Sequence, residues 1–197
     1  MNEKTQGREN RILSLVLSGV CIAASLFHIF IAWDTSISIV QQRVFHVFIM
    51  ILIYFLMQTE KAQKEGKRLG LLYGALSLAA AVVGGYFLAN TTLEALLKRG
   101  ISGTTDLDVA MGVILIVAVM YMAWRTVGWA LTALSAIFIG YAMAGPYMPE
   151  IIAHRGYNIS YITNYVAWTS ESIFGTCVSA CVSFVALYII FGELLDK

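Results

Sequence analysis

Long apolar runs separated by short polar stretches make up most of this chain. A helix needs about 20 apolar residues to cross the hydrocarbon core of a bilayer. Six runs approach or reach that length, at residues 12–33, 44–57, 69–90, 109–124, 127–147 and 177–195. The pattern therefore predicts an all-α integral membrane protein with about six transmembrane helices.

Two features of these runs leave alternatives open. The run 44–57 is short, and it reaches the usual length only if it takes in residues 39–43 and Gln58. The fourth and fifth runs are separated only by Arg125 and Thr126. They form either a tight helical hairpin or one long bent helix, and we expect the hairpin.

Composition supports a membrane protein and excludes other classes. Hydrophobic residues make up 59% of the chain and charged residues 13%, with a mean hydropathy of +0.76. Such a chain has too few charged side chains for an ordinary surface in water. A net charge of +1 provides no basic stripe for phosphates, so we expect no nucleic acid as a partner.

The distribution of positive charge predicts the topology, because cytoplasmic loops retain Lys and Arg. With a cytoplasmic N-terminus, nine of the 13 such residues lie inside, leaving Arg43, Lys98, Arg99 and Arg155 outside. We therefore expect both termini in the cytoplasm. The first apolar run is too long for a signal peptide and lacks a small-x-small cleavage site, so we expect it to stay as an anchor.

An interfacial helix is predicted on the outer face, at residues 158–172 between the fifth and sixth spans. Its isoleucines and Val166 provide an apolar side. Its aromatic side chains prefer the headgroup zone of a membrane. The alternative is a loop that carries a few aromatic residues.

Small residues at every fourth position predict close helix packing, since they let backbones approach in lipid. Such faces serve the chain's own helix bundle or a partner subunit, and the sequence does not separate the two. The residues concerned are Gly70, Gly74, Ala80, Gly84, Ala136, Gly140 and Ala144.

Polar residues in the spans offer weak candidates for chemistry. His28 and His46 either face one another across a hairpin or, as we prefer, are neutral side chains that form hydrogen bonds near the outer interface. No spacing joins them to Glu171 as an enzyme site, and the common catalytic motifs are absent. Cys177 and Cys181 have no further ligand at metal-binding spacing. We expect no enzyme activity and no cofactor.

Three polar motifs follow the fifth span. Residues 145–149 read Gly-Pro-Tyr-Met-Pro, residues 154–156 read His-Arg-Gly, and residues 169–175 read Thr-Ser-Glu-Ser-Ile-Phe-Gly. This order resembles the fused permeases of TRAP (tripartite ATP-independent periplasmic) transporters. The runs 102–108 and 125–131 resemble the start of that family's fourth span and the junction after it.

The resemblance implies two parts in the chain. Residues 1–125 would correspond to the small Q-type subunit, a four-helix membrane scaffold. Residues 126–197 would be the opening helices of the large M-type permease, ending before the re-entrant hairpins that bind substrate and Na⁺. One departure is the run 177–181, Cys-Val-Ser-Ala-Cys, where the family usually carries a proline.

The resemblance also implies a function and partners. It points to Na⁺-coupled, binding-protein-dependent uptake of organic acids across the cytoplasmic membrane of a bacterium or archaeon. We expect a scaffold component that does not transport alone, with Na⁺ bound only in the M-type portion. Its partners would be the M-type permease and an extracytoplasmic substrate-binding protein.

Residues on the outer face are the candidates for contact with those partners. The alternative function is an independent membrane structural or assembly protein that pairs with another membrane subunit. The candidate contact residues are Arg155, Tyr161, Tyr165, Trp168 and Glu171.

Overall fold

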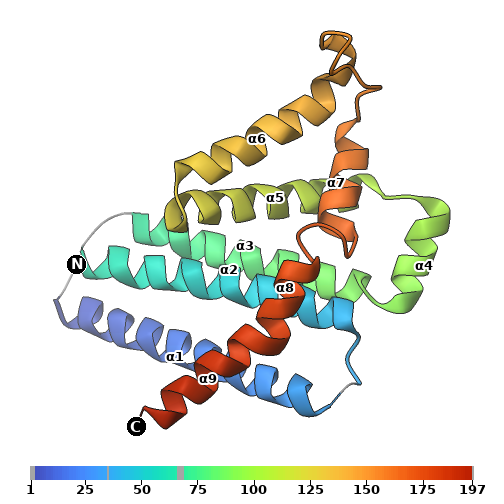
Figure 1. Ribbon diagram of the computed structural model, residues 1–197. Coiled ribbons are helices and arrows are strands. Elements are labelled where there is room, and N and C mark those ends of the chain that lie inside the picture. The colour runs from blue at the N-terminus through green and yellow to red at the C-terminus, as the bar shows by residue number, and fades with distance from the viewer. Residues whose placement is uncertain (1–2, 35, 66–68, 197) are drawn as a thin grey trace. The chain divides into compact units, whose positions relative to one another are not determined.

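The computed structural model describes residues 3–34, 36–65 and 69–196 (Figure 1). This part of the chain consists of helices joined by turns and loops, with no strand. Six helices are long and apolar enough to cross a membrane. The predicted all-α, multi-pass membrane architecture is confirmed. The six spans are Arg11–Trp33, Ile39–Lys64, Leu69–Asn90, Asp106–Thr126, Trp129–Tyr147 and Thr176–Leu195.

The helices fall into two units. One unit contains α1, α2 and α3 together with the C-terminal helices, and the other contains residues 93–175. The predicted boundary between residues 125 and 126 concerns the two permease parts of the resemblance, and it stays a prediction. The elements are α1 (Glu3–Trp33), α2 (Ile39–Lys64), α3 (Leu69–Asn90), α4 (Leu93–Ser102), α5 (Asp106–Thr126), α6 (Trp129–Ala144), η1 (Gly145–Tyr147), α7 (Ile159–Trp168), α8 (Thr176–Ala180), η2 (Cys181–Val185) and α9 (Ala186–Leu195).

Helix α2 is longer than the short apolar run that predicts it. The Ser38 side chain caps its N-terminus by accepting a hydrogen bond from the Gln41 backbone N–H. Lys61 and Lys64 lie in its last turn, where positive charge is favourable. The span therefore includes residues 39–43 and Gln58, as the length of a bilayer requires.

The predicted small-residue face of α3 lies against α2. A Cβ atom added to Gly84 would come within 3.0 Å of the Phe48 side chain, and one on Gly70 would lie 3.2 Å from Cγ of Gln63. Ala80 is buried and Gly74 faces the methyl group of Thr59. The two helices therefore pack closely, as small residues allow in lipid.

The last span is a continuous helix with one irregular turn. Residues Cys181–Val185 form a π-helical segment between α8 and α9. Nη2 of Arg43 donates a hydrogen bond of 3.1 Å to the Ser179 hydroxyl, which ties α2 to α8. The helix is not broken here, in agreement with the absence of a proline.

Helices α5 and α6 form the expected hairpin. Helix α5 ends at Thr126 and α6 begins at Trp129. Between them Gly128 adopts φ 125°, a backbone conformation that a side chain would strain. The two helices diverge from this turn, and α7 lies between their far ends (Figure 1).

Two elements between the spans differ from the prediction. Helix α7 covers Ile159–Trp168, so the C-terminal end of the predicted segment is not helical. At that end the Thr169 hydroxyl donates to the Tyr165 carbonyl and accepts from the Glu171 backbone N–H. The short amphipathic helix α4 was not predicted, because it falls below span length.

Candidate partner interface

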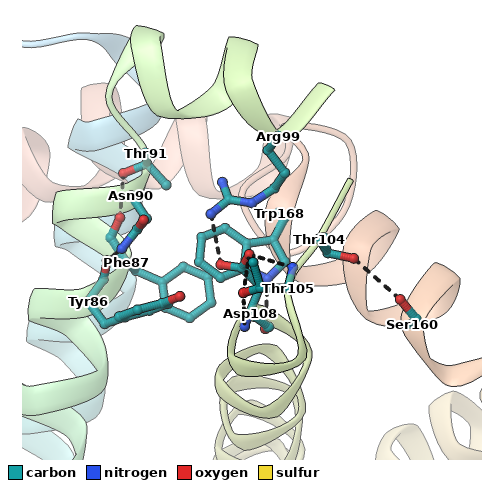
Figure 2. Close-up of polar contacts among 10 residues, drawn as sticks. All are labelled: Tyr86, Phe87, Asn90, Thr91, Arg99, Thr104, Thr105, Asp108, Ser160 and Trp168. Carbon is teal, nitrogen blue, oxygen red and sulfur yellow. Dashed lines mark hydrogen bonds and ion pairs between the residues drawn. The ribbon is translucent and has the colours of Figure 1, made fainter. Parts of the chain in front are cut away.

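Asp108 organises the corner between α4 and α5. Its Oδ2 atom accepts 2.9 Å hydrogen bonds from both the backbone N–H and the hydroxyl of Thr105, which completes a capping box at the start of α5. Its Oδ1 atom forms a 2.8 Å ion pair with Nη2 of Arg99. The two charged side chains are only 6% and 10% exposed. Both carboxylate oxygens are thus fully engaged (Figure 2).

Trp168 joins the end of α7 to the same corner. Its indole Nε1–H donates a 3.0 Å hydrogen bond to the backbone carbonyl of Asp108. The Arg99 guanidinium lies over its ring, with 3.9 Å between Cζ and the ring centroid. Such a stack is attractive because the ring face is electronegative. One tryptophan thereby connects α4, α5 and α7.

Close packing along α5 extends this connection. A Cβ atom on Gly112 would overlap the Thr163 methyl group and lie 3.2 Å from Cβ of Ala167. Thr163 and Ala167 are fully buried. Further along, the hydroxyl groups of Thr104 and Ser160 lie 3.3 Å apart. Helix α7 is therefore held against α5 along most of its length.

His154 orders the loop between α6 and α7. Its Nδ1 atom accepts from the Gly156 backbone N–H, and its Nε2 atom lies 3.1 Å from the Tyr141 carbonyl oxygen. Because a carbonyl only accepts, the ring carries its proton on Nε2. A Cβ atom on Gly145 would overlap this ring. The His-Arg-Gly motif thus folds the loop back onto the end of α6.

Aromatic rings continue from His154 toward α7. The ring of Tyr157 stacks on that of His154 at 5.7 Å and on that of Tyr161 at 4.8 Å. The Arg155 guanidinium lies over Tyr157 and Tyr161, at 4.8 Å and 5.9 Å from the ring centroids. The result is an exposed, positively charged platform on an ordered loop.

The predicted contact residues divide into two groups. Arg155, Tyr161, Tyr165 and Glu171 are exposed, so their side chains are accessible to another protein. Trp168 is only 5% exposed, so its side chain offers little surface to another protein. Its role is internal, because its ring and N–H are used by Arg99 and Asp108.

The two span histidines face one another in the other unit, as in the first of the two interpretations. Nε2 of His28 lies 2.8 Å from Nδ1 of His46, and Nδ1 of His28 lies 2.6 Å from the Ala24 carbonyl oxygen. They face one another because α1 and α2 pack side by side. No group of three metal-ligating side chains occurs in the described part of the chain.

Sequence reasoning missed the roles of Arg99, Asp108 and His154. Thr105 followed three residues later by Asp108 is close to a capping box, and this signal marks the start of α5. No local pattern predicts that Arg99 and Trp168 converge on that cap. Arg99 and Trp168 are far apart in the sequence, and they come into contact only in the tertiary fold.

Because the comparisons with known proteins give no match, we infer a function from the sequence motifs and from the geometry of the structure. No protein-family model, curated protein or solved structure matches this chain. The geometry described here offers an ordered exposed surface on α7 and the loop before it. Its aromatic and charged side chains are of the kind that protein interfaces use.

Proposed function

We propose that this chain is the membrane frame of a binding-protein-dependent secondary transporter of the TRAP type. In this role it braces a large permease subunit and does not carry substrate alone. The motifs at residues 145–149, 154–156 and 169–175 support the proposal. The first two motifs contact one another in the folded loop, where the His154 ring lies against Gly145.

The observation that supports a partner in the membrane is that two of the spans bury few of their side chains within the unit to which each belongs. Buried residues make up only 6% of the most apolar stretch of Trp129–Tyr147 and of Thr176–Leu195. In Ile39–Lys64 and in Leu69–Asn90 they make up 28% of that stretch. The exposed side chains of the two less buried spans include Ile137, Phe138 and Tyr188. A second membrane subunit would cover these faces, as helices in lipid associate through packing.

The outer segment would serve as the docking surface for the extracytoplasmic binding protein. Arg155 and Tyr161 are exposed and held in place by stacking, which lowers the entropy lost on binding. Tyr165 and Glu171 extend the same exposed segment. Tyrosine and arginine are enriched at the energetic centres of protein interfaces.

The remaining parts of the proposal concern location and chemistry. The chain would lie in the cytoplasmic membrane of a bacterium or archaeon with both termini inside, following its Lys and Arg distribution. The organic acid and Na⁺ would bind in the permease partner. This chain would supply only the frame and part of the docking surface.

Co-purification tests this function. The tagged chain is extracted in a mild detergent, and the accompanying membrane proteins are identified by mass spectrometry against an unrelated tagged membrane protein of similar size. We expect a large permease with Gly- and Ser-rich hairpins, together with an extracytoplasmic binding protein. Recovery of the chain alone overturns the proposal, and a different membrane subunit supports the assembly-protein alternative.

A further inference from the structure

An apolar groove of about 360 Å³ lies within the unit formed by α4 to α7. Val113, Val117 and Met120 line it from α5, Ala136 and Gly140 from α6, and Ile159 from α7. Helices α5 and α6 diverge from their turn, and α7 lies at the wide end (Figure 1). The groove therefore follows the opening between two membrane spans.

Small residues keep the groove open on the α6 side. Gly140 has no atom within 4 Å of a Cβ position, and Ala136 is exposed. The predicted packing face Ala136, Gly140 and Ala144 is thus not covered at these two positions by another helix of its own unit. Its small side chains create the hollow, where larger ones would fill it.

A positive charge lies next to this groove. The Tyr157 backbone N–H donates a 2.9 Å hydrogen bond to the carbonyl of Ala142, two residues beyond Gly140. Ile159, which lines the groove, follows Tyr157 by two residues. The Arg155 guanidinium lies over the rings of Tyr157 and Tyr161. Tyr161 belongs to α7, between Ile159 and Ile162, which both line the groove. The charge is therefore on the α7 side of the groove.

Arg155 is available to an anion. Its side chain is exposed, and its contacts among the described residues are with the rings of Tyr157 and Tyr161, with no carboxylate partner. Stacking fixes the guanidinium while leaving its N–H groups free to donate. A guanidinium held this way can bind phosphate through paired hydrogen bonds.

The lining of the groove suits a flexible apolar chain. All of its lining residues are apolar or glycine, and the groove volume is about 360 Å³. An acyl chain is narrow, adapts to such a surface and needs no polar partners within the groove.

We propose that this groove binds one acyl chain of an anionic phospholipid whose phosphate is held by Arg155. Charge complementarity and the apolar lining together select this occupant: a neutral lipid would not use the cation, and a soluble phosphate would not use the groove. The site is independent of the proposed transporter function, because it lies within one unit of this chain.

Native mass spectrometry of the purified chain tests the site. The detergent-solubilised protein is titrated with phosphatidylglycerol or phosphatidylcholine, and the fraction carrying one lipid is measured. We expect a preference for phosphatidylglycerol of about fivefold, the usual contribution of one basic residue near a lipid headgroup. Arg155→Gln should abolish the preference, and Gly140→Leu should lower binding of both lipids by filling the groove.

Two matched variants control for general effects. Gly85→Leu places the same side chain at another glycine with no atom within 4 Å of its Cβ position, and Arg125→Gln removes an exposed charge in the last turn of α5. Both should bind like the unaltered protein. Absence of a preferred lipid, retention of the preference by Arg155→Gln, or equal binding by Gly140→Leu and Gly85→Leu overturns the proposal. So does displacement of the lipid by soluble glycerol phosphate at equal concentration.

Discussion

Asp108 links three helices through one carboxylate and one carbonyl group. It caps α5 with Thr105, pairs with Arg99 of α4 and accepts from Trp168 of α7. Removing charges from water costs several kcal/mol per ion, and only close pairing and further hydrogen bonds offset that cost. Here both carboxylate oxygens have partners, so the ion pair is compensated.

Breaking this pair should destabilise the protein. In Asp108→Asn, the Arg99 guanidinium stays buried without its counter-charge, so we expect a loss of about 3 kcal/mol in the free energy of unfolding. In a chain of this size that corresponds to roughly 6–12 °C in Tm. Thermal unfolding of the detergent-solubilised protein measures it.

An exposed ion pair supplies the control for this prediction. Glu60 and Lys64 form a 2.9 Å pair in which the lysine is largely exposed. Glu60→Gln should cost about 0.5 kcal/mol or less. Equal shifts in Tm for the two variants would show that burial of the Arg99–Asp108 pair has no energetic importance.

Gly112 is required by the close approach of α7. In Gly112→Ala the added methyl group meets that of Thr163, and overpacking of this kind costs about 1–3 kcal/mol. Thr163→Ser removes the opposing methyl group, so the double variant should recover part of the lost Tm. Thermal unfolding of the single and double variants measures both effects.

The matched control is Gly85→Ala, where the new methyl group has open space. It should leave Tm unchanged or raise it slightly, since alanine favours a helix over glycine. If Gly112→Ala behaves like this control, α7 does not pack on α5 as described.

At the level of elements, the sequence predicts the features that follow a regular pattern of hydrophobic or small residues. It misses the elements that have no such pattern. The six spans follow from hydropathy, and the packing face of α3 follows from the spacing of Gly70, Gly74, Ala80 and Gly84. That spacing does not identify α2 as the helix that it contacts. Helix α4 is too short to register as a span. The end of α7 depends on the Thr169 hydroxyl, which competes for the backbone groups that would continue the helix.

The site was predictable only in part, for a similar physical reason. Arg155 and Tyr161 belong to motifs or aromatic patterns visible in the sequence, and both are exposed. Trp168 belongs to the same aromatic pattern yet is buried, because the stack on Arg99 joins residues 69 positions apart in the chain. Periodicity carries no information about such a pairing.

Helix α7 should be accessible from outside the cell on its exposed side. In a variant lacking native cysteines, Asn158→Cys and Ser170→Cys place thiols at exposed positions flanking the helix. Both should react with an impermeant thiol reagent in intact cells. Thr163→Cys, at a fully buried position on the same helix, should not react. Labelling of the exposed positions only after permeabilisation would show that α7 lies on the cytoplasmic side and would contradict the predicted topology.

Across the whole molecule, burial is distributed unevenly among the helices. Helices α2 and α3 pack closely through small residues, whereas α6 and the last span leave most of their side chains exposed. A frame needs both properties, a packed portion that holds its shape and faces left for a partner. Cross-linking from the exposed faces separates a permease partner from lipid.

Photo-cross-linking from the exposed spans is the most direct test of whether a permease subunit covers them. A benzophenone amino acid is placed at Ile137 of α6 or Tyr188 of α9, with the similarly exposed Leu78 of α3 as the control, and cross-linked proteins in intact cells are identified by mass spectrometry. We expect capture of a large permease bearing the substrate-binding hairpins at Ile137 or Tyr188, in higher yield than at Leu78. Capture of no membrane protein from either position, or equal capture at all three, would contradict the frame.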